Sequence, residues 1–354
     1  MFENVSLAPA DGGKQFVRVK AVTEHFPGLK TFTFEADGVK TRTLAPARAG
    51  NYISVTANVG GSRVTRAYTL ASSPREASEE GVYISTIKKA GILSGYLLDE
   101  VKEGDVLEVS KPDGKFVYDA ENDAAYVVGV AGGAGITSML SMAKAAVEGS
   151  EPFTMTLFYC VRNAFELLFT EKLDALDPRR VQVVYVVEED TPDFAEKGVF
   201  TAEMLAKYTG GRECTLFACG GDALYGHIAR ELAGCGSVRN MKFSANSVTD
   251  RENTEGRVFA LRVHMGGRTY DIPARAGETL MVAMERAGLK ALSQCRVGEC
   301  GFCRSLALSG NFTTDPAHDR RSTQDKERGI IHPCCTYPDG DAEISVPVDP
   351  AEEI

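Results

Sequence analysis

The chain has 354 residues, of which 44% are hydrophobic and 25% charged, and its formal net charge is −10. This length exceeds what one hydrophobic core usually organises, so we expect two or three domains. The composition is that of a globular protein, and a negative charge without a basic stripe argues against a nucleic-acid partner.

The sequence indicates a cytoplasmic protein. Its first residues, MFENVSLAPADGG, have neither the basic nor the apolar region of a signal peptide. The longest largely apolar stretch, residues 124–136, is too short and glycine-rich for a membrane span. In a reducing compartment, the nine cysteines would bind metal, take part in chemistry or fill the core rather than form disulfides.

The pattern of apolar residues divides the chain into parts. Residues 1–119 hold six strand-like stretches with period-2 alternation, which predict an antiparallel β-barrel. These are QFVRVKAV, LKTFTFEA, NYISVTANV, AYTLAS, VYISTIKK and DVLEVS. Residues 120–240 alternate buried strands such as AAYVVGV and FTMTLFYC with helical segments, which predicts an α/β domain with a parallel sheet.

The remaining residues predict a linker and a third domain. Residues 241–257 contain the polar segment NSVTDRENTEG, which is typical of a linker. Residues 258–354 begin with two strands around Gly266 and Gly267, a hairpin signal, followed by the short amphipathic helix ETLMVAMERAG. The strand AEISVPV closes this α+β domain.

Cysteines in the third domain follow a metal-binding spacing. Cys295, Cys300 and Cys303 form C-x4-C-x2-C, and the pair Cys334 and Cys335 lies further along the chain. This is the plant-type [2Fe–2S] pattern, in which one loop and one distant position supply four thiolates. We predict Cys334 as the fourth ligand and Cys335 as a spare thiol.

The cysteines and His332 also have alternative roles. A structural zinc site normally takes two close pairs of ligands, which fits this spacing poorly, and a set of core cysteines is the remaining alternative. His332 is expected beside the cluster rather than on it, because histidine ligation of the Rieske kind needs two histidines on one iron. Gly298 and Gly301 would let the backbone curl and point amides at the cluster sulfurs.

The run CRVGECGFC, with GIIHPCCTYP downstream, resembles the ferredoxin domain fused to flavin reductases that feed oxygenases. The family's G-x4-C-x3-P signature is matched by Gly329, Cys334 and Pro338, which supports Cys334 as the ligand. The resemblance implies a β-grasp fold for this domain.

Two stretches in the barrel resemble flavin-binding motifs of the ferredoxin–NADP reductase superfamily. RAYTLASSP is similar to R-x-Y-S-x-x-S-x-P, which implies that Arg66 pairs with a flavin phosphate, Tyr68 packs on the isoalloxazine and Thr69 hydrogen-bonds its N5 edge. KKAGILSG fits the G-x-x-S element, which implies that Gly91 and Ser94 meet the pyrophosphate. This second element favours FAD over FMN. Taken alone, the two stretches would be an exposed strand and a turn.

The second domain contains a glycine-rich turn between a strand and a helix. AYVVGVAGGAGITSML places Gly132, Gly133 and Gly135 where bare amides can cradle a pyrophosphate, although it is not G-x-G-x-x-G. It resembles the superfamily's G-G-x-G-I-T-P loop, which adds Thr137 to the site and leaves Ser138 in the proline position. A plain strand-to-helix turn is the alternative.

FACGGDALYGHI resembles the superfamily's C-G-P element. The resemblance implies that Cys219, with Gly220 beside it, lies against the nicotinamide where the hydride leaves for the flavin, whereas Gly221 replaces the proline. The alternative is a buried cysteine at a strand end. Three other cysteines are expected to be packing residues, Cys160, Cys214 and Cys235.

The sequence favours NADH over NADPH as the reductant. Arg162 is the one cation in CVRNAFELLFTEK placed to meet a 2′-phosphate, and Val161 and Phe169 stand where NADPH-preferring relatives have hydroxyls. One arginine without supporting donors makes a weak phosphate clamp, so NADPH is the second choice.

Together the motifs predict an NAD(P)H:acceptor oxidoreductase. Hydride from NADH reaches FAD, and single electrons pass through a [2Fe–2S] cluster to a protein acceptor, with an oxygenase or hydroxylase as the first hypothesis. Catalysis would be mostly positioning by Thr69, Tyr68 and Cys219. The alternatives are an electron-transfer subunit of a larger dehydrogenase or anaerobic reductase, and a redox carrier or sensor with a degenerate nucleotide site.

Overall fold

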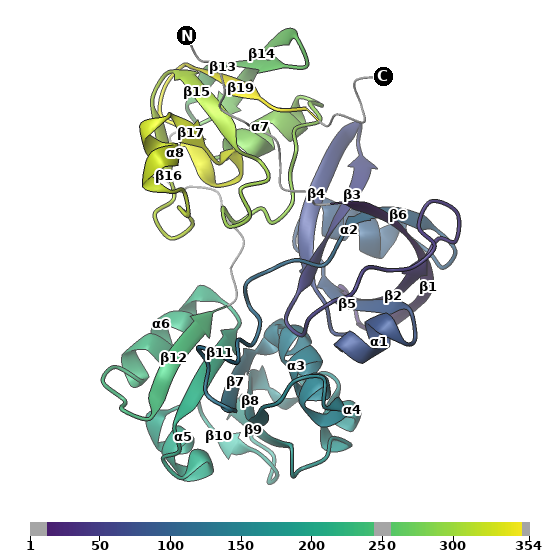
Figure 1. The fold of residues 1–354 in the computed structure, drawn as a ribbon, viewed down its shortest axis with the longest axis vertical. Coiled ribbons are helices and arrows are strands. Elements are labelled where there is room, and N and C mark those ends of the chain that lie inside the picture. Colours follow the sequence, from purple (N-terminus) through teal and green to yellow (C-terminus); the bar gives the residue numbers. More distant parts are fainter. Residues whose placement is uncertain (1–12, 244–255, 349–354) are drawn as a thin grey trace.

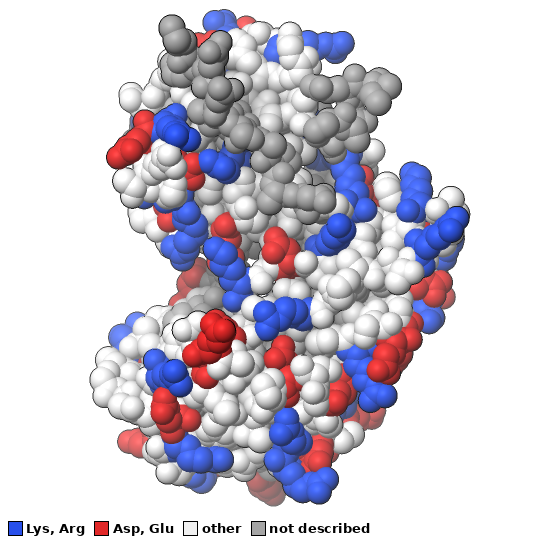
Figure 2. Space-filling view, in the orientation of Figure 1, with Lys and Arg blue, Asp and Glu red and all other residues white. Residues whose placement is uncertain are grey.

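The computed structural model describes residues 13–243 and 256–348. The chain forms three bodies, with strands β1–β6 at the right of Figure 1, the second body below them and the cysteine-bearing body above. Most of the predicted linker, residues 244–255, lies outside the described residues. Positive and negative side chains are interspersed over the face shown in Figure 2. No helix in the described parts of the chain is long and apolar enough to cross a membrane.

The first body is a curled antiparallel sheet with strand order β4-β3-β6-β1-β2-β5. Its strands are β1 (Lys14–Phe26), β2 (Leu29–Ala36), β3 (Tyr52–Val59), β4 (Ser62–Thr69), β5 (Val82–Lys88) and β6 (Val106–Ser110), and its helices are α1 (Pro74–Ser78) and α2 (Ile92–Asp99). The outer strands meet where Ser85 Oγ donates to the Thr69 carbonyl at 3.0 Å. The six predicted strands are therefore present, and the sheet closes beside the RAYTLASSP stretch.

The second body is a parallel sheet of order β10-β9-β8-β7-β11-β12. Its strands are β7 (Tyr126–Gly132), β8 (Thr154–Asn163), β9 (Val181–Glu189), β10 (Glu196–Lys197), β11 (Cys214–Cys219) and β12 (Val238–Phe243). Its helices are η1 (Gly133–Gly135), α3 (Ile136–Glu148), η2 (Ala164–Glu166), α4 (Thr170–Asp174), α5 (Ala202–Thr209) and α6 (Asp222–Glu231). Strand β12 continues to Phe243, past the predicted end of the second domain at residue 240, because it stays paired with β11.

The order of these strands creates a switch point. Strand β7 lies between β8, which follows it in the chain, and β11, which comes much later. Helix α3, which follows β7, and helix α6, which follows β11, pack into different core clusters. Crevices at such switch points are where doubly wound sheets bind nucleotides.

The third body is a five-stranded sheet of order β14-β13-β19-β15-β17 beside a two-stranded sheet, β16-β18. Its strands are β13 (Val258–Met265), β14 (Arg268–Arg275), β15 (Ser305–Ser309), β16 (Phe312–Thr314), β17 (Ile330–Ile331), β18 (Thr336–Pro338) and β19 (Ala342–Val346). Its helices are α7 (Leu280–Arg286), α8 (Thr323–Glu327) and η3 (Pro333–Cys335). β13 runs parallel to β19, with α7 packed on the sheet, so the domain has the β-grasp form. Gly266 and Gly267 both have positive φ, as the tight hairpin turn requires.

The first two bodies are joined by a shared core. Phe116 of the first packs edge-on against Phe217 of β11, with ring centroids 5.2 Å apart. Helix α3 also contacts the end of the RAYTLASSP stretch, where Ser141 Oγ donates to the Ser72 carbonyl at 2.7 Å. Helix α3, which follows the predicted nucleotide loop, is thus tied directly to the segment that carries the predicted flavin residues.

Candidate functional site

The four predicted cluster ligands lie together in the third body. Cys303 Sγ is 3.4 Å from Cys334 Sγ, and the Cys295 thiol interacts with those of Cys300 and Cys334. Hydrogen bonding to Cys334, together with burial, raises the pKa of the Cys303 thiol well above its ordinary value. Such crowded thiols give up their protons when a metal supplies positive charge, so this donor set fits a metal centre.

The backbone around these thiols supports sulfur ligation. The amides of Val297 and Cys300 point at Cys295 Sγ, at 3.5 and 3.4 Å, and the Phe302 amide points at Cys300 Sγ at 3.4 Å. Gly298 has φ +74°, and a Cβ there would lie 2.1 Å from the His318 carbonyl oxygen. The loop can therefore take this curl only with glycine at position 298.

Cys335 faces away from the thiol cluster. Its Sγ lies 3.5 Å from the His332 carbonyl and 3.7 Å from that of His318. Cys334 contacts Cys303 instead, so the two neighbouring cysteines have different surroundings. The geometry favours Cys334 as the ligand, because its sulfur is the one that reaches the loop cysteines.

His332 is buried behind the cysteine loop. Its Nδ1 lies 3.0 Å from the Gly298 carbonyl oxygen, and its Nε2 has no hydrogen-bond partner among the described residues. Burial lowers the pKa of this imidazole. Its contact with the loop backbone fits the expected supporting role.

The arrangement differs from a single-ion site. In the described parts of the chain, no three histidine, cysteine or acidic side chains converge as they would around one metal ion. A plant-type cluster holds two irons with two thiolates each. The contacts of Cys303 with Cys334, and of Cys295 with Cys300, agree with such pairs.

A cavity of about 660 Å³ lies between the first and third bodies and contains the predicted flavin motifs. Its lining residues come from the barrel strands, the start of α2, the segment after β6, β12 and the cysteine loop. They are Gly50, Tyr52, Arg66, Ala67, Tyr68, Thr69, Lys88, Ala90, Gly91, Ile92, Leu93, Ser94, Gly114, Lys115, Phe116, Lys242, Cys295, Arg296, Val297 and Glu299. Such a volume is within the range of cofactor sites.

The side chains of the RAYT stretch take up different positions around this cavity. Burial raises the pKa of the Tyr68 hydroxyl. The Thr69 carbonyl accepts the hydrogen bond from Ser85 that closes the barrel. The Thr69 hydroxyl has no hydrogen-bond partner among the described residues. Arg66 Nη1 contacts both carboxylate oxygens of Glu285 at 3.2 Å and donates to the Thr65 carbonyl at 2.8 Å. Its Nε and Nη2 make no bond to described residues, so they remain available to a phosphate.

Gly91 and Ser94 build the start of α2. The Ser94 hydroxyl accepts hydrogen bonds from the Ala90 and Gly91 amides, both at 2.9 Å. Ser94 therefore shapes the loop rather than offering a free hydroxyl. A Cβ at Gly91 would meet no protein atom within 4 Å, and Gly91 lines the cavity, so the position leaves space for a ligand against bare backbone.

The cysteine loop forms one wall of the same cavity. Cys295, Arg296 and Val297 line it together with Tyr68 and Thr69. Tyr52 lies beside both sites. It lines the cavity, and its pKa is raised by burial and by its proximity to the Cys295 and Cys300 sulfurs.

The two predicted nicotinamide loops contact each other at the switch point. A Cβ at Gly135 would lie 1.9 Å from the Cys219 carbonyl oxygen, and one at Gly132 would lie 2.8 Å from Leu224. Gly133 has φ +52° and open space where a Cβ would stand. The glycines therefore have two tasks: Gly132 and Gly135 allow close packing, and Gly133 leaves room for a ligand.

Other predicted residues near these loops have internal partners. The Thr137 hydroxyl, almost fully buried, donates to the Ala134 carbonyl at 2.9 Å, so it holds the turn. The Gly220 amide donates to the Tyr225 hydroxyl at 3.1 Å. Cys219 is 9% exposed, and its Sγ lies 3.6 Å from Ser138 Oγ. Ser138, in the family's proline position, thus contacts the predicted hydride-transfer cysteine directly.

Arg162 is exposed at the end of β8, and its Nε lies 2.7 Å from Glu189 Oε1 at the end of β9. Glu189 neutralises Arg162 and would repel a 2′-phosphate placed there. This contact could not be read from the sequence, because it depends on the register that pairs Asn163 with Glu189.

The structure does not bring every motif into one cavity. Within the described chain, the flavin cavity is lined by neither the glycine-rich loop nor Cys219. The sequence analysis gave no site role to several polar lining residues. Tyr52, Lys115 and Lys242 lie outside the flavin-binding and cysteine motifs, whereas Lys88 lies within KKAGILSG and Arg296 within CRVGECGFC.

Comparison with known proteins agrees with the three bodies. Residues 18–118 match the oxidoreductase FAD-binding domain, residues 130–230 the oxidoreductase NAD-binding domain, and residues 263–339 the 2Fe-2S iron-sulfur cluster binding domain.

Several relatives span nearly the whole chain. Phthalate dioxygenase reductase of Burkholderia cepacia is 28% identical over 93% of this chain and 96% of its own length. Glycine betaine monooxygenase reductase subunit of Pseudomonas aeruginosa is 24% identical, covering 94% and 95%. NADH oxidoreductase HCR of Escherichia coli is 26% identical, covering 85% and 89%.

The fold of the whole chain is also similar to that of a solved structure. A solved structure of phthalate dioxygenase reductase superposes with a TM-score of 0.68, covering 96% of this chain and 100% of that one at 22% identity. The order of domains, the fold and the relatives agree. The chain therefore belongs to the flavin reductases of the ferredoxin–NAD(P) reductase superfamily that carry a fused C-terminal [2Fe–2S] ferredoxin domain.

Proposed function

We propose that this chain is the reductase component of a multicomponent oxygenase and takes electrons from NADH. The observation that carries the proposal is the single cavity lined both by the RAYT stretch and by the cysteine loop that begins at Cys295. When bound, FAD accepts hydride and the [2Fe–2S] cluster carries single electrons, so that each NADH oxidised to NAD⁺ and a proton supplies two one-electron transfers. A shared cavity supports direct passage between the two centres.

The residues of the flavin cavity act by binding and orientation. We assign Tyr68 and Thr69 to the isoalloxazine, because they line the cavity and the described chain gives neither hydroxyl a hydrogen-bond partner. Arg66 can offer Nε and Nη2 to a phosphate while Nη1 stays on Glu285. Gly91 would leave room for the pyrophosphate at the start of α2.

The nicotinamide is assigned to the switch point. Gly133 would leave space for the nucleotide phosphates, while Gly132 and Gly135 let the β7 and β11 loops approach each other. That approach holds Cys219 beside Ser138 at the end of β11. The role of these groups is to hold the nicotinamide in line with the flavin, and no described side chain is required as a general acid or base.

NADH is the proposed reductant because Arg162 is paired. Its guanidinium contacts Glu189 at 2.7 Å, so part of its hydrogen-bonding capacity is already used, and the carboxylate beside it opposes a 2′-phosphate.

The oxygenase partner is proposed from the relatives. Two of the full-length relatives are named as reductases of a dioxygenase and of a monooxygenase. A second candidate acceptor, a redox protein without oxygenase activity, is favoured by the similarity to NADH oxidoreductase HCR, whose name mentions no oxygenase. We further propose the cytoplasm as the compartment, since none of the nine cysteines, all of them described, forms a disulfide.

An anaerobic titration tests the proposal. Purified protein is titrated with NADH and then, separately, with NADPH, while visible absorbance and low-temperature EPR are recorded. Flavin bleaching by NADH followed by a reduced [2Fe–2S] signal is expected. Loaded protein that neither nucleotide reduces would refute the reductase assignment. Crosslinking of the reduced protein to its acceptor then decides the partner, and an acceptor without an oxygenase centre would refute the first choice.

A further inference from the structure

A buried carboxylate joins the flavin barrel to the cysteine loop. Glu285 lies at the end of α7 in the ferredoxin domain and is 6% exposed. It contacts Arg66 of β4 at 3.2 Å, and it also accepts a hydrogen bond from the Thr65 amide at 3.3 Å. One ferredoxin-domain side chain therefore contacts the backbone and a cation of the flavin-motif strand.

The same carboxylate holds the cysteine loop. Arg296 donates from Nη1 to Oε1 at 3.0 Å and from Nη2 to Oε2 at 3.1 Å, a two-point contact that fixes its direction. Arg296 directly follows Cys295, and it has φ +64°, a left-handed conformation unfavourable for a residue with a Cβ. The contact with Glu285 compensates for this conformation and anchors the loop where it lines the flavin cavity.

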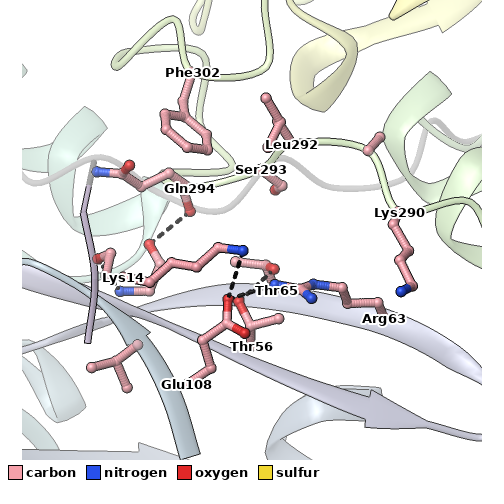
Figure 3. A pocket seen from close by; sticks show the side chains of 14 residues that line it. Lys14, Thr56, Arg63, Thr65, Glu108, Lys290, Leu292, Ser293, Gln294 and Phe302 are labelled. Atoms are coloured by element: carbon pink, nitrogen blue, oxygen red, sulfur yellow. Dashed lines mark hydrogen bonds and ion pairs between the residues drawn. The ribbon is translucent and has the colours of Figure 1, made fainter. Parts of the chain in front are cut away.

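Further hydrogen bonds complete this part of the boundary. Ser54 Oγ of β3 donates to the Gln294 carbonyl at 2.9 Å. Gln294, which lies above the barrel strands in Figure 3, also donates from Nε2 to the Asp113 carboxylate at 2.8 Å. Figure 3 also shows Phe302 and Leu292 of the cysteine-bearing domain above the barrel strands. Individually such contacts are modest, and polar boundaries between domains normally permit movement.

We propose that Glu285 is a positioning residue for electron transfer, which holds the cysteine loop against the flavin cavity by pairing with Arg66 and Arg296 together. This inference rests on the proposed function, since it concerns the step between flavin and cluster. Without the carboxylate, two guanidinium groups would face each other at a buried boundary, and their repulsion would favour separation of the domains. The rate of the one-electron step then falls with the fraction of molecules that remain docked.

The chain offers a matched control just before the same helix. Glu278 is also buried, at 5% exposure, and its carboxylate contacts Arg286 at 2.5 Å, but both residues belong to the ferredoxin domain. Glu278→Gln therefore removes a buried charge from the same domain without touching the barrel.

Stopped-flow reduction by NADH separates the two steps. In Glu285→Gln we expect flavin bleaching within about twofold of wild type and cluster reduction slower by about tenfold or more. In Glu278→Gln both rates should match wild type. Glu285→Asp keeps the charge but is one methylene shorter and reaches Arg66 less well, so it should slow cluster reduction by about threefold. This variant tests the same contact if Glu285→Gln fails to fold.

Hydrogen–deuterium exchange provides a readout independent of turnover. Glu285→Gln should increase deuterium uptake in peptides that contain Thr65 and in those covering residues 290–297, whereas Glu278→Gln should not.

Three results would overturn the inference. Cluster reduction at the wild-type rate in both Glu285 variants would show that the contact does not position the loop. Equal slowing in Glu278→Gln would indicate general damage to the domain. Slowed flavin bleaching would place the effect of Glu285 at the flavin, through Arg66. Failure of the proposed function itself would differ from all three, because wild-type protein would then not be reduced by NADH.

Discussion

Replacing Gly135 by alanine should disable the nicotinamide site while leaving both other centres intact. Gly135 has φ −60°, so alanine causes no backbone strain there. The obstacle is steric, because the new Cβ would lie 1.9 Å from the Cys219 carbonyl oxygen and 2.5 Å from its carbonyl carbon. These are backbone atoms that cannot rotate away, so the β7 and β11 loops must separate by about 1 Å.

The losses of stability and of hydride-transfer rate both follow from that displacement. Overpacking of this kind typically destabilises a protein by about 1 to 3 kcal/mol, which the domain should survive. A misplacement of about 1 Å at a reacting centre can cost about a hundredfold in rate, so we expect hydride transfer from NADH to slow by about that factor. The barrel and the cysteine loop are untouched, so flavin and cluster contents should remain at wild-type levels.

Stopped-flow flavin bleaching by NADH is the assay, and Gly221→Ala is the control. Gly221 begins α6 with φ −83°, and a Cβ there would meet no atom within 4 Å. The control should therefore react at the wild-type rate. Wild-type kinetics in Gly135→Ala would refute the view that contact between the two loops positions the nicotinamide.

Three further outcomes are expected. Cys334→Ser should abolish the [2Fe–2S] EPR signal and Cys335→Ser should preserve it, because only Cys334 contacts another loop thiol. Glu189→Gln should raise the NADPH-to-NADH ratio of kcat/KM by about fivefold, since it releases Arg162 and removes a repelling carboxylate. Burial raises the pKa of Cys214 to about 11, so about one thiol in a thousand is ionised at pH 8, and alkylation by iodoacetamide should accelerate as pH rises.

Each of these outcomes has a contrary result. An intact, reducible cluster in Cys334→Ser would show that another residue is the fourth ligand. An unchanged NADPH-to-NADH ratio of kcat/KM in Glu189→Gln would show that the contact between Arg162 and Glu189 does not affect nucleotide selectivity. Rapid labelling of Cys214 in native protein at pH 8, followed by mass spectrometry of its peptide, would contradict its place in the core of the nucleotide domain.

The sequence was most informative where chemistry depends on residues close together in the chain. The C-x4-C-x2-C loop, the RAYT stretch and the glycine-rich turn each lie within one local segment, so spacing and residue type sufficed to predict them. Alternation with period two likewise predicted the six barrel strands, because one face of each strand is buried. The order of the three domains followed from these local patterns.

Tertiary structure decided the contacts between segments that are distant in the chain. No local pattern shows that Glu285 contacts Arg66, 219 positions away, or that Arg162 is neutralised by Glu189 across two strands. The tertiary structure likewise places Cys295 on the wall of the flavin cavity. It also engages the Ser94 and Thr137 hydroxyls in hydrogen bonds with the protein's own backbone. The physical reason is that a motif specifies which groups a segment can offer, whereas the packing of the whole chain determines which of them already have partners.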